Sequence, residues 1–179
     1  TYGSGIMALE IKGTKVDNTD VLVSAKTEVD MFRLTASKSD NGTDITANLE
    51  RCDDASFSKI GTGMTESSGI FTFPRTGVYK VTVQANITGD SADSAAVVQT
   101  DVTTNNSTYD GVAYAAGGDD GGSGTHQTTA FSQCFVNVTD TSNVKVKFQI
   151  YSFASGSQLN GDTDLNKTCF AFERLGDSQ

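Results

Sequence analysis

Residues 69–87, GIFTFPRTGVYKVTVQANI, constrain the fold more than any other part of the chain. The first residues mix Ile, Phe and Thr, a composition that fits a pleated, half-buried strand. Pro74 and Gly77 then bracket a tight turn, because one fixes φ and the other is permissive. After the turn the apolar positions alternate strictly, and those on one face are Tyr79, Val81, Val83, Ala85 and Ile87. This alternation predicts a long strand with one face in a core.

The remaining composition predicts more strands and no helix of any length. Only 36% of the 179 residues are hydrophobic. Thr, Ser, Asn, Gly and Asp are abundant, and they compete with or weaken a helical backbone. Short alternating segments separated by turn residues recur from residue 29 onward, so we expect about nine or ten strands in one sandwich or barrel domain, residues 29–179.

Residues 1–28 differ from the rest. They contain three short alternating segments separated by Lys and Asp, with too little apolar surface to fold alone. We predict an extended arm that attaches the domain to another protein. An extra strand pair and a frayed terminus are the alternatives.

Three local predictions concern the region before residue 69. Asn41-Gly42 is a dipeptide that closes hairpins, and residues 45–51 follow it as a candidate strand. Residues 57–60 are predicted as another short strand, which would end at the glycines of GTGM.

Charge and cysteine content exclude several functions. The chain has 13 basic and 22 acidic residues, a net charge of −9, and no basic cluster, so we expect no binding to nucleic acid. No apolar run is long enough for membrane insertion. The three cysteines, Cys52, Cys134 and Cys169, are an odd number with wide spacing, which indicates free thiols in a chain folded in cytoplasm.

The pattern G-x-F-x-F-P-x-x-G-x-Y-x-V within residues 69–81 resembles the central signature of the C1q/TNF-like globular domain. Phe32–Ala36 is similar to the first core strand of that family, and residues 169–177 are placed like its final strand. The resemblance covers roughly residues 29–177. It implies a two-sheet jelly-roll sandwich that assembles as a homotrimer.

The phrase NLERCDDASFSKIGTGMTESSGIFTFPRTGVY and the closing FERLGD resemble C1q-like modules in virion proteins of marine tailed bacteriophages. This implies a non-enzymatic structural protein on the virion surface, as a capsid decoration, head fibre or tail-fibre tip. It would bind other virion proteins through residues 1–28, stabilise the particle, and adhere to a host-surface glycan or protein. A secreted C1q/TNF-like recognition module or ligand is the alternative, and a carbohydrate-active enzyme is a third.

Aromatic residues on the predicted strands have two possible roles. Packing in the core is the first expectation for all of them. The resemblance adds a second, because C1q/TNF-like modules trimerise about an axis lined by aromatic and aliphatic side chains. On that basis the candidates for the trimer interface are Phe71, Tyr79, Phe148, Tyr151, Phe170 and Phe172.

No motif in the sequence predicts catalysis or a cofactor. His126 is the only histidine, and we expect it on the surface. The loop GGDDGGSG offers Asp119 and Asp120 as calcium ligands, and NGDTD offers Asp162 and Asp164. Neither loop has the alternating D-x-D-x-D spacing of a specific calcium motif. Solvated carboxylates, as also expected for Asp53 and Asp54, are therefore the favoured interpretation.

Overall fold

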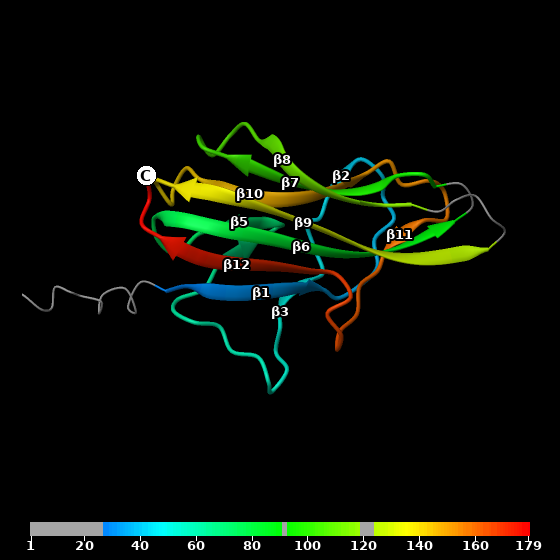
Figure 1. The fold of residues 1–179 in the computed structure, drawn as a ribbon, viewed down its shortest axis with the longest axis horizontal. Helices are drawn as coiled ribbons and strands as arrows, with labels where there is room; N and C mark the ends of the chain where they lie inside the picture. Colours follow the sequence, from blue (N-terminus) through cyan, green and yellow to red (C-terminus); the bar gives the residue numbers. More distant parts are fainter. Residues whose placement is uncertain (1–26, 91–92, 119–123) are drawn as a thin grey trace, which may run out of the picture.

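The computed structural model describes residues 27–90, 93–118 and 124–179. Within these ranges there is no helix, and the chain forms twelve β-strands in two antiparallel sheets packed face to face (Figure 1). This confirms the predicted all-β, two-sheet fold. No helix in the described ranges could cross a membrane.

The first sheet is built around the long strand β6. Its strands are β1 (Val29–Leu34), β3 (Leu49–Arg51), β6 (Gly77–Asp90), β9 (Thr125–Val138), β11 (Gln158–Leu159) and β12 (Cys169–Gly176). β6 pairs with β9 on one side and with β12 and the short β11 on the other, and β12 continues to β1 and β3. Buried and half-buried residues alternate along all 14 residues of β6, as its sequence predicts.

The second sheet has the order β4-β5-β10-β7-β8, and β2 also pairs with β10. Its strands are β2 (Thr43–Asp44), β4 (Thr65–Ser67), β5 (Ile70–Thr72), β7 (Ala96–Thr103), β8 (Asp110–Gly117) and β10 (Lys145–Tyr151). β8 and β9, each at one edge of its sheet, lie side by side and form one long margin of the sandwich.

A cluster of aromatic rings fills the space between the sheets. Phe71 of β5 is its centre, because its ring lies 5.1 Å from Phe32, 5.6 Å from Phe148 and 5.0 Å from Phe172. Phe148 also stacks on Phe170 at 4.2 Å. These contacts join β1, β10 and β12 to the strand of the G-x-F-x-F signature, which explains why that signature marks the fold.

Two predictions before residue 69 are wrong in detail. Residues 45–51 are not one strand, because Asn48 takes a left-handed φ of 60° and separates β3 from β2. Asn41-Gly42 does form a turn, with Gly42 at φ 75°, yet it closes no hairpin. β1 belongs to the first sheet and β2 to the second, so the turn carries the chain between sheets.

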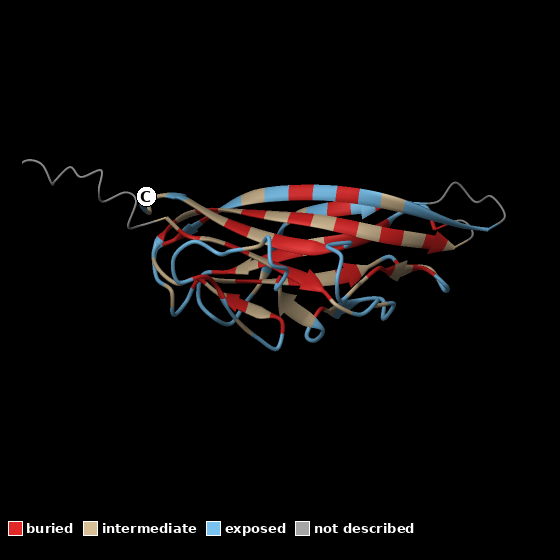
Figure 2. Cartoon of the chain, turned by 90° about the horizontal axis from the view of Figure 1, so that it is seen from below, coloured by how far each residue is buried: buried red, intermediate tan, exposed pale blue. Residues whose placement is uncertain are grey.

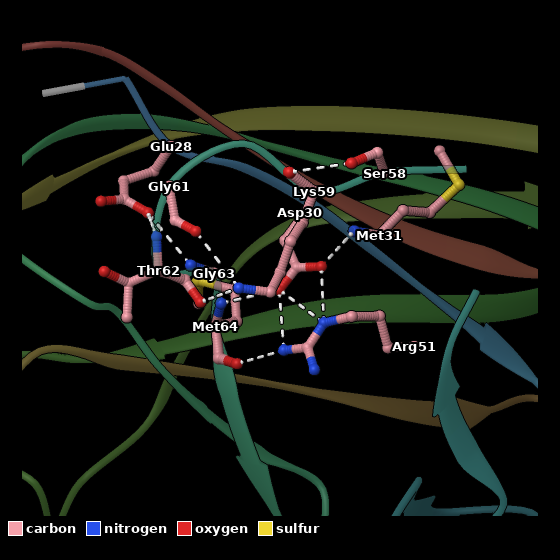
Figure 3. Close-up of polar contacts among 10 residues, drawn as sticks. All are labelled: Glu28, Asp30, Met31, Arg51, Ser58, Lys59, Gly61, Thr62, Gly63 and Met64. Atoms are coloured by element: carbon pink, nitrogen blue, oxygen red, sulfur yellow. Dashed lines mark hydrogen bonds and ion pairs between the residues drawn. The ribbon is translucent and has the colours of Figure 1, made fainter. Parts of the chain in front are cut away.

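Residues 57–60 form no strand, which corrects the third prediction; only Ile60 makes an isolated bridge, to Val29. The loop that contains them is held instead by two buried acids (Figure 3). Glu28 accepts hydrogen bonds from the backbone N–H groups of Thr62 and Gly63, and Asp30 accepts one from Met64 at 2.7 Å. We call Glu28 and Asp30 the acidic clasp.

The clasp is paired with two arginines. Arg51 contacts both oxygens of Asp30, at 2.9 and 3.1 Å from its Nε, and Arg75 Nε donates to Glu28 at 2.7 Å. Both acids are almost completely buried, so their charges depend on these partners. Glu28 is thus part of the folded domain, and residues 1–26 of the predicted arm lie outside the described residues.

The strands place the loops at two opposite ends of the sandwich. Figure 1 shows the C-terminus and the start of β1 at the same end. Residues 35–42, 93–95 and 152–157 lie toward the other end, which we call the distal end.

Candidate functional site

Five of the six predicted interface aromatics lie inside a single copy of the chain. Phe71, Tyr79, Phe148, Phe170 and Phe172 are each at most 1% exposed. They are core residues, as first expected. Their assignment to a trimer interface is corrected, because a second copy cannot reach a side chain enclosed between the two sheets. Tyr151, at the end of β10, is half-buried.

The exposed aromatics are on other strands. Of the seven large apolar side chains that the described residues expose, four belong to β8 and β9: Val112, Tyr114, Phe131 and Phe135. The last three are between 62% and 67% exposed. We call these four residues the edge surface. Figure 2 shows the exposed positions of β9 as pale bands along the uppermost long strand.

The inverted pattern of β9 explains why sequence reasoning missed this surface. Its core-facing residues include Ala130, Ser132 and Val136, while Phe131 and Phe135 point outward. Small residues face inward and large aromatics face outward, the reverse of an ordinary amphipathic strand. Alternation in the sequence reveals two faces, and tertiary packing decides which of them is buried.

The edge surface lacks charge. β9, THQTTAFSQCFVNV, contains no Asp, Glu, Lys or Arg, and β8 contains only Asp110. Charged residues are 20% of the whole chain, so these 22 strand positions are clearly depleted. Depletion of charge together with enrichment in Tyr and Phe is typical of the centre of a protein interface.

Both strands also leave backbone groups unpaired. Within the described residues β9 pairs only with β6, and β8 pairs only with β7. Proteins normally protect such edges with lysine, proline or a short strand length. β9 has 14 residues and contains neither lysine nor proline, so none of these features protects its edge.

The outer face of the first sheet is open beside β9 and covered farther away. Next to β9 it carries Lys80, which pairs with Glu173 at 2.5 Å, and Gln84, which donates to the carbonyl of Asn166 at 2.9 Å. On the β1 side, Arg33 is only 1% exposed, because Asp53 and Asp54 of the following loop bind its guanidinium. Asp53 and Asp54 are exposed, as expected for solvated loop carboxylates, and each also pairs with Arg33.

The predicted calcium ligands are not brought together in the described residues. Asp119 and Asp120 lie outside them. Asp162 accepts a bond from Lys167 Nζ at 2.7 Å and from the backbone N–H groups of Asp164 and Leu165. The described ranges hold no group of three or more metal-binding side chains, and calcium binding stays a prediction.

The carboxyl group of Asp162 should make the free energy of unfolding depend on pH in the acid range. The hydrogen bond from Lys167, followed by those from the backbone of Asp164 and Leu165, lowers the pKa of its carboxyl well below the ordinary value. The ionised group therefore stabilises the fold above about pH 4, and this contribution is lost as the pH falls toward the folded-state pKa. We expect the unfolding free energies of wild type and Asp162→Asn to differ by a constant amount above about pH 5 and to converge below pH 4. Urea titrations at each pH test this, and a difference that does not change with pH would contradict it.

The three cysteines are free, as the sequence predicted. Burial raises the pKa of Cys169 to about 11, and the nearby Cys52 adds to the shift. Only about one thiol in a thousand is then ionised at pH 8, and the thiolate is the reactive form. We expect Cys169 to resist iodoacetamide in the native protein and to react after unfolding, as read by peptide mass spectrometry. Labelling of native Cys169 at the rate of a free thiol would contradict this.

His126 is exposed at the start of β9, paired in register with Gly89 of β6. The sequence placed it on the surface, and the structure confirms that placement.

The comparison with solved structures identifies the fold. Eiger TNF from S. frugiperda aligns with a TM-score of 0.62 at 13% identity, covering 86% of this chain and 95% of that one. Murine APRIL at pH 8.5 aligns with a TM-score of 0.58 at 14% identity, covering 84% of this chain and all of that one. The fold is a TNF-like jelly roll. No family model and no curated protein matches the sequence.

Proposed function

We propose that this chain is a non-enzymatic structural and interaction protein that assembles as a homotrimer through the edge surface. The observation that supports this most directly is the pair of adjacent edge strands with exposed aromatics and almost no charge. Burying Val112, Tyr114, Phe131 and Phe135 against another copy would remove apolar area from water and cover two unpaired strand edges.

We place the second half of the contact on the open outer face of the first sheet. The edge surface is apolar, whereas the open outer face of the first sheet carries polar groups such as Lys80 and Gln84 together with aliphatic stems. An edge packed against this face in the next copy is a head-to-tail contact, and such contacts form closed rings when the rotation permits. Three copies is the number that the C1q/TNF-like resemblance implies.

We further propose that the trimer is displayed on the surface of a bacteriophage particle, as a decoration, head-fibre or tail-fibre module. The support is the resemblance of residues 48–79 and 172–177 to virion modules, together with the position of the termini. The residues that precede Glu28 would attach the trimer to other virion proteins. The distal ends of three copies would then face outward, where weak contacts with a host-surface glycan or protein gain from multivalency.

The virion assignment is tested on purified particles from the source of the sequence. Mass spectrometry should detect this chain in particles banded in a density gradient, and antibodies against it should label the particle surface in electron micrographs. Recovery of the chain only in the particle-free medium would contradict this assignment and support a secreted recognition module.

A further inference from the structure

A polar pocket lies at the distal end, away from the edge surface. Its volume is about 240 Å³, and its walls come from residues 37–40, which follow β1, and residues 46–48, which precede β3. The buried side chain of Leu34 also contributes to the lining. β1 and β3 are on the opposite side of the first sheet from β9, so the pocket is separate from the edge surface.

Backbone contacts hold the two walls in place. Lys38 exchanges two backbone hydrogen bonds with Leu159 of β11, at 2.9 and 2.8 Å. The carbonyl of Asn48 accepts the N–H of Thr35 at 2.8 Å and its hydroxyl at 3.2 Å. These bonds fix Asn48 in its left-handed conformation, and a pocket with fixed walls loses little entropy when it binds a ligand.

The groups in the pocket favour a neutral, hydroxyl-rich ligand. The side chains of Ser39, Thr46 and Asn48 make no hydrogen bond within the described residues, so donors and acceptors of both kinds remain available. Lys38 Nζ is paired with Asp40 at 3.2 Å, so the one cation and the one anion of the lining offset each other. An anion or a cation would have to break this pair, whereas a sugar hydroxyl can both donate and accept.

The size of the pocket suits a single sugar ring. Pockets for drug-sized ligands have volumes of roughly 300–1,000 Å³. This one is smaller, about 240 Å³, which suits one monosaccharide unit, such as a residue at the end of a glycan chain. We propose that this pocket binds one neutral sugar residue of a surface glycan. The inference extends the proposed adhesive function, because a trimer would present three such pockets together.

The test uses the full native chain and four soluble probes: D-glucose, D-galactose, D-mannose and N-acetyl-D-glucosamine. A few hydrogen bonds in a single pocket give dissociation constants of about a millimolar, so saturation-transfer difference NMR is measured up to roughly 20 mM sugar. We expect at least one neutral sugar to bind saturably. The anionic N-acetylneuraminic acid and the cationic glucosamine should bind more weakly.

The Asn48→Gly variant tests whether the sugar binds in this pocket. Glycine adopts a φ of 60° without strain, so the variant keeps the backbone and loses only the amide side chain. We expect its affinity for the bound sugar to fall about tenfold. Asn106→Gly is the matched control, because Asn106 has a φ of 56° and lies outside the pocket, and its affinity should not change.

Three results would overturn the inference: no binding of any neutral sugar, equal binding by wild type and Asn48→Gly, or tighter binding of a charged probe. None of these three results tests whether the chain forms a trimer. That is determined separately from its native mass. A trimer without sugar binding would reject the pocket alone, and a monomer that binds sugar would reject the assembly proposal alone.

Discussion

Replacing Phe131 and Phe135 together with glutamate is expected to convert the trimer to monomers. Both rings are more than 60% exposed in the single chain, so the exchange removes little from the fold of each copy. At the centre of an interface, truncating an aromatic anchor costs about 2–4 kcal/mol, and a buried unpaired carboxylate adds to that cost. Two such changes per copy should weaken association by more than about a thousandfold.

Sedimentation velocity at micromolar concentration measures this effect. Ile60→Glu is the control, because Ile60 is 51% exposed and lies beside β1, away from β9. It adds one carboxylate per copy at an exposed apolar position and should leave the trimer intact. Circular dichroism should show the same strand content in all three proteins. A Phe131→Glu/Phe135→Glu variant that remains trimeric would place the interface elsewhere.

Asp30→Asn is expected to cause the largest loss of fold stability from a change of one charge. The Asp30 carboxylate is buried, contacts Arg51 through both oxygens, and accepts the N–H of Met64. Removing one partner of a buried ion pair costs about 3–5 kcal/mol. We expect about 3 kcal/mol, at the lower end, because the Arg51 side chain is 36% exposed and regains some hydration.

Urea unfolding in the monomeric Phe131→Glu/Phe135→Glu background isolates this effect, since unfolding of a trimer also depends on protein concentration. The matched control is Asp40→Asn, which removes an ion pair whose acid is 75% exposed and should cost less than about 1 kcal/mol. Equal losses for the two variants would show that the clasp does not hold the loop before β4.

Local pattern was enough to predict the central strands and the fold class. Tyr79, Val83 and Ile87 alternate with polar residues over a length that only a strand accommodates, and the structure buries all three. The composition around them excludes helices, and the described ranges contain none. These predictions succeed because strand periodicity is a property of neighbouring residues.

The edge surface and the clasp depend on contacts between distant parts of the chain. Phe131 and Phe71 are both aromatic residues in predicted strands, and only the assembled sandwich exposes one and encloses the other. The pairing of Asp30 with Arg51 and Met64 spans 21 and 34 positions, and no local motif marks it. The left-handed glycines Gly61 and Gly63 were a partial signal, because a side chain at either would collide with Glu28 or Asp30.

The native mass of the purified chain, measured by light scattering after size exclusion, shows whether the chain forms a trimer. We expect a mass near three times 18.8 kDa that persists on dilution to low micromolar concentration. A mass of 18.8 kDa under the same conditions would contradict assembly through the edge surface.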